Sequence, residues 1–282
     1  MIVSVASGKG GTGKTLVATS LALSLDSAEE VELLDCDVEE PNAHLFLDLK
    51  LTKSWNVCVP VPEINELKCT HCGKCADVCA FNALAVLEKK VLVFPELCHG
   101  CGACSYLCPE AAIVERDREI GVVEGGASGN MLFFQGKLTI GEMMAPPLIK
   151  ATKKHIDKDR MVFIDVPPGT SCPVVEAISG SDFCLLVTEP TPFGLNDLAL
   201  AVGVARELQI PCGVVLNRSG TENSAVEDYC RQEDIPVLLK IPLDMEIARA
   251  YSRGIPLVRG IPSWREPFRQ LFRDIRQRIS DN

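Results

Sequence analysis

Eight of the fourteen cysteines in this 282-residue chain fall in two runs with the same spacing. The first run holds Cys69, Cys72, Cys75 and Cys79, and the second holds Cys98, Cys101, Cys104 and Cys108. Each run reads C-x₂-C-x₂-C-x₃-C, and Cys98 follows Cys69 by 29 residues. Thiolates at this spacing are ligands for iron–sulfur clusters. The repeated run therefore predicts an internal duplication that holds metal.

Zinc is the competing interpretation, because paired C-x₂-C units also bind tetrahedral Zn²⁺. Two complete eleven-residue runs are more specific than paired C-x₂-C units, and this favours clusters. The runs differ after their last cysteine, where Pro109 follows Cys108 but Ala80 follows Cys79. The missing proline removes no ligand.

A second set of residues near the N-terminus has the composition of a phosphate-binding loop. The segment 8–15 reads GKGGTGKT, after a short apolar strand at 2–6 and before an apolar helix at 15–25. Glycines let backbone N–H groups close around phosphate oxygens at a helix N-terminus. We expect Lys14 to reach the β- and γ-phosphates and Thr15 to bind Mg²⁺. The predicted nucleotide-binding residues of this loop are Gly8, Lys9, Gly10, Gly11, Thr12, Gly13, Lys14 and Thr15.

Polar side chains follow three further apolar strands. Asp35 and Asp37 follow the strand at 31–35, Asp165 ends the strand at 161–165, and Asn217 lies near the end of a strand that begins at 212. A doubly wound parallel sheet brings the carboxyl ends of its strands to one ligand crevice. We therefore expect these side chains to surround the phosphate loop.

The loop and the aspartates together resemble the MinD/ParA-type ATPases, whose deviant phosphate loop carries an additional lysine. The resemblance covers residues 1–57 and 119–282. It implies that Lys9 contacts the nucleotide of a partner subunit, that Asp37 orients the attacking water, and that Asp165 holds Mg²⁺ through water. It also implies that Asn217 reads adenine and that Asp35 supports either the loop or the metal shell. Lys9, Lys14 and Asp37 are the expected catalytic residues.

The cysteine runs resemble the bacterial two-cluster ferredoxin, in which the fourth cysteine of each run binds the other cluster. The resemblance implies two [4Fe–4S] clusters. The first is assigned to Cys69, Cys72, Cys75 and Cys108, and the second to Cys98, Cys101, Cys104 and Cys79. MinD-like ATPases with such an insertion form a recognisable subgroup, and the segments 37–46 and 141–150 look like its characteristic sequences.

The expected fold is therefore α/β, with a mostly parallel, doubly wound phosphate-loop sheet and a small α+β ferredoxin-like domain inserted into it. The ATPase domain is discontinuous, at 1–57 and 119–282, and the inserted domain spans 58–118. Prolines and charged residues around 59–68 are typical of a segment that joins two domains.

The remaining features of the sequence limit the cellular compartment and the partners that we expect. The N-terminus lacks a secretory signal, no apolar run is long enough to cross a membrane, and the net charge is −10, so we expect a cytoplasmic protein without nucleic acid. The tail at 263–282 is amphipathic, and core packing is favoured over membrane contact and over a surface for a partner. The cysteines in or beside apolar strands and helices are expected to behave as small apolar residues; they are Cys36, Cys58, Cys184, Cys212 and Cys230. Cys172 is also expected to pack as a small apolar residue, with a subunit-bridging metal site as the alternative.

Three functions are consistent with these motifs. The first is an ATP- and Mg²⁺-dependent dimeric switch, a homodimer or a heterodimer with a paralogue, that gates electron transfer to a metalloprotein. The second is a factor that assembles or inserts a metal cluster. The third is a spatial organiser whose clusters sense redox state. Eight complete ligands favour the first two, because a spatial organiser needs no pair of clusters.

Overall fold

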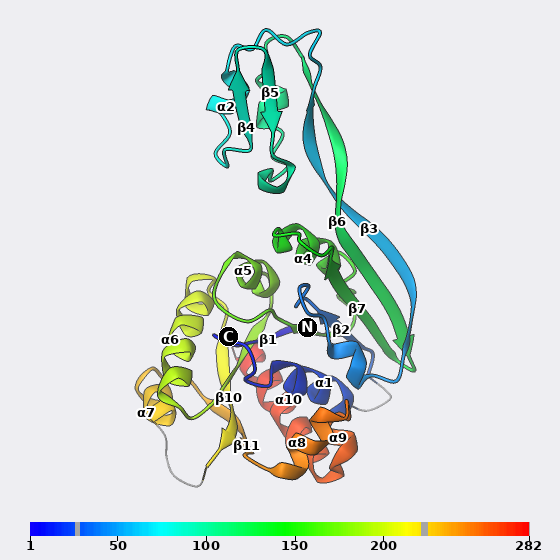
Figure 1. Ribbon diagram of the computed structural model, residues 1–282. Helices are drawn as coiled ribbons and strands as arrows, with labels where there is room; N and C mark the ends of the chain where they lie inside the picture. Colours follow the sequence, from blue (N-terminus) through cyan, green and yellow to red (C-terminus); the bar gives the residue numbers. More distant parts are fainter. Residues whose placement is uncertain (26–28, 221–224, 282) are drawn as a thin grey trace.

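The computed structural model describes residues 1–25, 29–220 and 225–281. These residues form a body, an extended two-stranded arm and a small tip at the end of the arm (Figure 1). In this described part, no helix is both long and apolar enough to span a bilayer.

The body is built on a nine-stranded sheet with the order β11-β10-β9-β1-β8-β2-β7-β6-β3. Seven neighbouring strands, from β11 to β7, are parallel, and β6 and β3 then run antiparallel at one edge. The expected mostly parallel α/β fold is confirmed. The strands are β1 (Ile2–Ala6), β2 (Val31–Asp35), β3 (Lys50–Ile64), β6 (Ile113–Ser128), β7 (Met131–Leu138), β8 (Met161–Asp165), β9 (Phe183–Thr188), β10 (Cys212–Ser219) and β11 (Val237–Pro242).

Helices cover both faces of the sheet, because its central strands are apolar on both sides. One apolar core lies beneath α1 (Lys14–Ser24), α8 (Met245–Ser252), α9 (Leu257–Gly260) and α10 (Arg265–Ser280). The other lies beneath α4 (Ala145–Lys153), α5 (Cys172–Ile178), α6 (Pro192–Glu207) and α7 (Ala225–Gln232). Short 3₁₀ turns are η1 (Ala43–Phe46), η2 (Pro95–Leu97) and η3 (Pro262–Trp264).

The C-terminal helix α10 packs against the body. Phe268, Leu271 and Ile275 are almost completely buried in the core beneath α1, while the arginines of the helix lie at its outer side. The expected core packing of the tail is confirmed.

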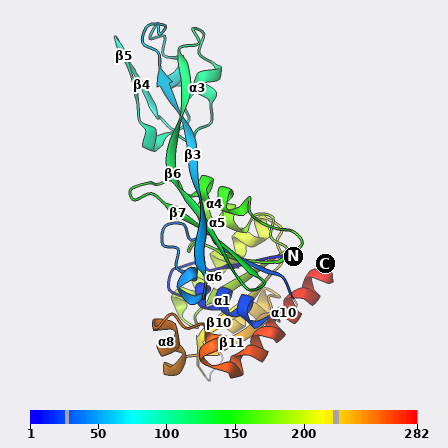
Figure 2. The same ribbon diagram turned by 90° about the vertical axis from the view of Figure 1, so that its right-hand side faces the viewer.

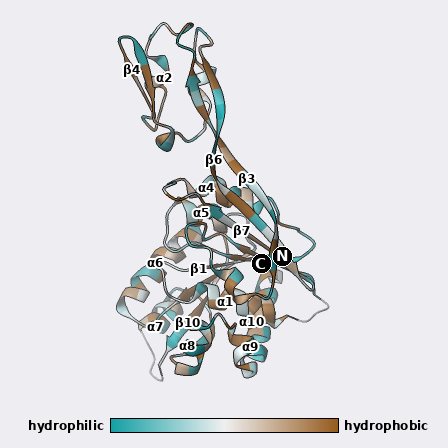
Figure 3. Ribbon diagram, turned by 45° about the vertical axis from the view of Figure 1, so that its right-hand side comes forward, coloured by the Kyte–Doolittle hydropathy of each residue, from teal (hydrophilic) through white to brown (hydrophobic). Residues whose placement is uncertain are grey.

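The arm is formed by β3 and β6, which pair antiparallel from Lys50↔Ala127 to Ile64↔Ile113. Both strands leave the edge of the sheet side by side and carry the tip away from the body (Figure 2). Where the arm adjoins the body it is hydrophobic, and Ile120 and Val123 are buried there (Figure 3). The ladder shifts register between Val57 and Cys58, at the predicted domain boundary. The segment 59–64, expected to be a linker, is instead part of β3.

The tip, residues 65–112, repeats one backbone pattern 29 residues apart. Helix α2 (Lys74–Asp77) matches α3 (Ala103–Tyr106), and β4 (Leu84–Leu87) matches the first residues of β6. Strand β5 (Lys90–Val93) matches the last residues of β3, so the β4–β5 hairpin repeats the end of the arm. The predicted duplication is therefore present in the backbone as well as in the cysteine spacing.

Candidate functional site

The phosphate loop joins β1 to α1 and uses glycine where other residues would be strained. Gly11 and Gly13 have φ of 78° and 98°, in the left-handed region that favours glycine. A Cβ atom on Gly13 would lie 2.3 Å from the amide nitrogen of Asn217. The loop therefore combines a left-handed backbone with close approach from β10.

Thr15 and Asp165 meet directly below this loop. Thr15 Oγ1 donates a hydrogen bond to Asp165 Oδ2 at 2.6 Å, and Asp165 is almost completely buried. The second oxygen, Oδ1, is buried without a hydrogen-bond partner among the described residues. A carboxylate oxygen and a hydroxyl are oxygen donors of the kind that Mg²⁺ prefers. The donor set at this end of β8 therefore fits a hydrated Mg²⁺.

Lys14 lies among acidic groups at the centre of the site. Burial lowers the pKa of its ammonium group, while the carboxylates of Asp165 and Asp37 act in the opposite direction. Burial also raises the pKa of Asp165 to about 7 and that of Asp37 to about 6. Lys14 lowers both of these carboxyl pKa values. The buried ammonium group of Lys14 therefore faces the carboxylates of Asp165, Asp37 and Asp35, at a site suited to charged ligands.

Asp35 has a structural role beside these groups. Its fully buried carboxylate accepts backbone N–H groups from Asp37 at 3.0 Å and from Asn42 and Ala43 at 2.9 Å each. These three bonds fix the turn after β2, and that turn presents Asp37 to the cleft. Of the two expectations for Asp35, loop support is the one that the geometry shows.

Asn217 is positioned next to the loop. Its Nδ2 donates to the Thr12 carbonyl at 2.7 Å, and its Oδ1 accepts the backbone N–H of Arg218 at 2.9 Å. Both polar groups of this amide are therefore used within the chain, and Asn217 braces the loop. Adenine recognition by Asn217 stays a prediction.

Beside the loop lies a cleft of about 410 Å³. Its phosphate end is formed by Gly13, Lys14, Thr15 and Asp37, and its opposite wall comes from the end of β11 and from α8. On that wall, Tyr251 stacks on Phe46 of η1, with ring centroids 4.9 Å apart. Apolar and aromatic surface beyond a phosphate loop suits a flat heterocyclic base. The cleft therefore has the composition of a nucleotide site.

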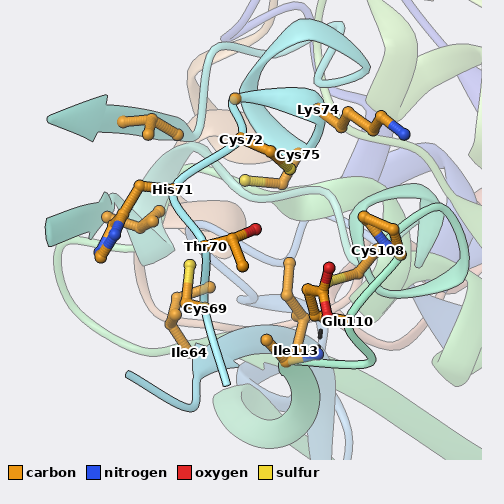
Figure 4. A pocket seen from close by; sticks show the side chains of 15 residues that line it. Ile64, Cys69, Thr70, His71, Cys72, Lys74, Cys75, Cys108, Glu110 and Ile113 are labelled. Atoms are coloured by element: carbon orange, nitrogen blue, oxygen red, sulfur yellow. Dashed lines mark hydrogen bonds between the residues drawn. The ribbon is translucent and has the colours of Figure 1, made fainter. Parts of the chain in front are cut away.

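The tip contains two cavities, each lined by four cysteines. The first is lined by Cys69, Cys72, Cys75 and Cys108, which Figure 4 shows around one space. The second is lined by Cys79, Cys98, Cys101 and Cys104. Each cavity therefore combines three cysteines of one run with the last cysteine of the other.

Backbone N–H groups point at several of these sulfur atoms. Ala83 N lies 3.2 Å from Cys79 Sγ, and Ala112 N lies 3.3 Å from Cys108 Sγ. These two contacts are equivalent in the 29-residue repeat. N–H donors stabilise negative charge on a thiolate. Cys79 and Cys108, the last cysteines of the two runs, therefore each have a backbone N–H that stabilises the thiolate form.

The cysteines are spread around the cavities. Among the described residues, no group of three or more His, Cys, Asp or Glu side chains is placed to hold a single metal ion. Cys172 begins α5 and is exposed, so the expectation that it packs in the core is wrong. Cys58, also expected to behave as a buried apolar residue, is exposed on the arm. Cys36, Cys184 and Cys230 are buried as expected, and Cys212 is partly buried.

Comparison with known proteins agrees with this geometry. Residues 3–257 match the family model for the CobQ/CobB/MinD/ParA nucleotide binding domain. The chain belongs to this family. An uncharacterized protein, MJ0579, from Methanocaldococcus jannaschii is 34% identical over 90% of each chain. The iron-sulfur cluster carrier protein of the same organism is 23% identical and covers 98% of this chain and 83% of its own.

A solved structure shows the same fold as this member of the CobQ/CobB/MinD/ParA family. The septum site-determining protein MinD from Pyrococcus horikoshii, complexed with Mg-ADP, superposes with a TM-score of 0.58. It is 21% identical, and the match covers 97% of this chain and 95% of that one. The expected MinD/ParA-type fold is therefore confirmed.

Lys9 occupies a different place from the other loop residues of this family member. Its Nζ lies 3.7 Å from Glu189 Oε2. Lys9 is not among the described residues that line the cleft. The side chain is about one-third exposed, at 37%. Within one chain, Lys9 therefore contacts a carboxylate and not the phosphate end of its own cleft.

Two features of the cleft were not predicted from the sequence. They are Tyr251 and the apolar residues of α8, which follow β11 in the sequence and line the cleft. The residue that could have indicated them is Asp244. Its carboxylate accepts the backbone N–H of Glu246 at 2.6 Å and caps α8 where the sheet ends. A capping aspartate after a parallel strand marks a loop on the ligand side of the sheet.

Proposed function

We propose that this chain is an ATP-dependent dimeric switch that carries two [4Fe–4S] clusters and gates electron transfer to a metalloprotein partner. The observation that carries the proposal is the pair of cavities in the tip. Each gathers four cysteines in the crossed arrangement of a two-cluster ferredoxin. We assign residues 58–118 to this inserted domain.

The nucleotide half of the proposal rests on the cleft beside the phosphate loop. Lys14 is placed to neutralise phosphate charge, while Thr15 and Asp165 provide the oxygen donors for hydrated Mg²⁺. Asp37 is held at the cleft by the turn that Asp35 fixes, so it can orient a water molecule. These roles make ATP hydrolysis the reaction proposed for the cleft.

Lys9 supports the proposed dimer. Because it lies outside its own cleft, it can supply positive charge to the phosphates of a second subunit when two clefts face one another. Charge supplied in trans stabilises the transferring phosphoryl group only in the closed dimer. We propose a homodimer or a heterodimer with a paralogue, in the cytoplasm and without nucleic acid.

The residues of the tip fit the clusters that the proposal requires. When bound, a [4Fe–4S] cluster takes up and releases single electrons, and its potential depends on the surrounding protein. The chain's own contribution is to supply four thiols to each cavity and to direct N–H groups at the sulfur atoms of Cys79 and Cys108. These N–H groups stabilise the thiolate form that binds iron.

Metal content of anaerobically purified protein tests the proposal. The expected result is about eight irons and an equal amount of labile sulfide per chain, with absorption that bleaches in air. Stoichiometric zinc without labile sulfide, in protein never exposed to air, would contradict the cluster assignment and leave the nucleotide cleft unaffected.

Cluster assembly for another protein is the second candidate. The relative named iron-sulfur cluster carrier protein, which matches over nearly the whole chain, favours it. Residues 231–282 contain no C-x₂-C unit of the kind that cluster carriers use, and this argues against it. Incubation with an apo-ferredoxin separates the two functions. Electron transfer leaves about eight irons on the chain, whereas assembly moves iron and sulfide to the acceptor.

A further inference from the structure

A groove of about 640 Å³ separates the tip from the body. The tip contributes Phe81, Leu97 and His99, and the body contributes residues before and within α4 and the first residues of α5. On the body side, Met143 and Cys172 are exposed. The groove is therefore a shared surface of the two parts, with apolar and sulfur-containing side chains on the body side.

Only one of the two cysteine cavities adjoins this groove. Phe81 and His99 line both the groove and the second cavity, and their rings stack with centroids 3.5 Å apart at 9°. Of the described residues that line the first cavity, none lines the groove. At the positions of the first cavity that match His99 and Phe81 by the 29-residue offset stand Thr70 and Glu110, which have no aromatic rings to stack. The two cysteine sites are therefore unequal in their relation to the body.

The body side of the groove is connected to the nucleotide cleft by one short segment. Pro168 lines the cleft, and Cys172, four residues further along, lines the groove. Between them, Gly169 N donates to the Ser7 carbonyl at 3.0 Å, which ties the segment to the start of the phosphate loop. The segment begins directly after Asp165, the proposed Mg²⁺ residue. A displacement of Pro168 at the cleft is therefore linked to Cys172 at the groove through only four residues of continuous backbone.

The last turn of α5 is held to the neighbouring helix α4. Lys153 at the end of α4 donates to the carbonyls of Glu176 and Ala177, at 2.7 and 3.0 Å. Helix α4 in turn carries Pro146, Pro147 and Lys150 on the groove. The two helices that line the body side of the groove are therefore linked by hydrogen bonds from Lys153.

We propose that residues 166–173 transmit the nucleotide state of the cleft across the groove to the second cysteine site, and that the first site does not respond. This inference rests on the proposed function, because it concerns clusters bound in the two cavities. If nucleotide alters the surroundings of the second site, the oxidation state of that site alters nucleotide affinity by the same factor, since linkage is reciprocal.

The test measures the midpoint potential of each cluster by electron paramagnetic resonance, with ADP and with a non-hydrolysable ATP analogue. Cys72→Ala and Cys101→Ala identify the signals of the first and second sites. Exchange of ADP for the analogue should shift the second signal, and a tenfold coupling corresponds to about 59 mV for one electron. The first signal should stay unchanged. Equal shifts at both sites, a shift at the first alone, or no shift would overturn the inference.

A matched pair of variants examines the groove contact itself. Phe81→Ala removes the stacked ring beside the second site, and Glu110→Ala changes the equivalent position beside the first site. Phe81→Ala should reduce the nucleotide-dependent shift by at least about half, whereas Glu110→Ala should leave it intact. Equal effects of the two variants would contradict the proposed path.

Amide hydrogen exchange on the unmodified protein gives a second readout. The backbone of 96–99 should change its exchange rate between ADP and the ATP analogue, and the matched segment 67–70 should not. Protein that contains no iron contradicts the proposed function. Protein with two clusters that both ignore the nucleotide contradicts only this inference.

Discussion

Lys9 Nζ lies 3.7 Å from Glu189 Oε2, and Arg218 donates to the other oxygen of the same carboxylate at 2.6 Å. Two cations therefore share one acidic side chain at the end of β9. The lysine of the phosphate loop is held by its own chain, and it must leave Glu189 before it can reach a second subunit.

Lys9→Ala should bind ATP with nearly unchanged affinity but hydrolyse it slowly. The loss should be at least about tenfold and at most the roughly 10³-fold that a cation supplied in trans can contribute.

Glu189→Gln should favour ATP-dependent dimerisation, because it removes the carboxylate charge that holds Lys9 within its own chain. Release of a surface ion pair is worth about 0.2–1 kcal/mol, so ATP-dependent dimerisation should tighten by up to about fivefold. Glu233→Gln, which breaks the Arg206 pair, is the control.

Steady-state hydrolysis and analytical ultracentrifugation measure these effects. Hydrolysis by Lys9→Ala at the rate of the unmodified protein would show that Lys9 acts only within its own chain.

Lys14→Ala and Asp37→Ala should separate nucleotide binding from turnover. Removal of the buried cation at the phosphate end should reduce ATP binding to below detection by calorimetry, because the carboxylates of Asp165 and Asp37 then face the phosphates alone. Asp37→Ala should bind ATP and remain in the closed dimer, because it lacks the group that orients water. A monomeric Asp37→Ala protein in the presence of ATP would argue against this role.

Single cysteine variants test the crossed cavities. Cys75→Ala and Cys108→Ala belong to the same cavity, so each should lose the same cluster, and the double variant should lose no more than about four irons. Cys75→Ala combined with Cys79→Ala should lose both clusters, although these cysteines are only four residues apart. Iron analysis together with the electron paramagnetic resonance spectrum decides this. Loss of one cluster only, in the second double variant, would assign each run to its own cluster.

Glu32 should make the stability of the fold depend on pH. It is completely buried in β2, its Oε2 accepts the Asp157 N–H at 2.8 Å, and its Oε1 lacks a partner among the described residues. Burial raises the pKa of Glu32 to about 7 from 4.5. Between these values the folded state keeps a proton that the unfolded state has released, so the free energy of unfolding falls as pH rises. The loss is at most about 3 kcal/mol.

Glu32→Gln keeps an acceptor without the charge, so it should remove the contribution of Glu32, reduce the fall in the free energy of unfolding between pH 5 and 7, and stabilise the protein above pH 7. Anaerobic denaturant titrations between pH 5 and 8 measure it. The exposed Glu207→Gln is the control. If the free energy of unfolding of Glu32→Gln changes with pH as steeply as that of the unmodified protein, Glu32 is not a source of the pH dependence.

The nucleotide cleft could be predicted from the sequence because its signals are local. The phosphate loop is one continuous segment between a strand and a helix, and Asp35 and Asp165 end strands that a parallel sheet must bring to the same edge. The opposite wall was missed, because Tyr251 reaches the cleft only through the packing of α8 on η1. Spacing along the chain carries no information about that contact.

The arm was misinterpreted for a physical reason. Pro60 and Pro62 suggested a linker, because proline cannot donate to a sheet ladder. The structure places both in β3, which is the last strand of the sheet and has a partner on one side only. On such an edge strand a missing N–H can face away from the ladder.

The arm also bears on how such a chain can arise and be re-engineered. Strands β3 and β6 leave the sheet as direct neighbours, paired from Lys50↔Ala127 outward, so everything beyond Val57 and Gly121 is one long excursion between two adjacent positions. A short hairpin turn at that point would restore a continuous antiparallel edge without altering the order of any other strand. The strand order therefore permits removal or replacement of the cysteine-bearing unit without a change in the order of the nucleotide-binding sheet, provided that the core contacts of Val59 and Ile120 are kept.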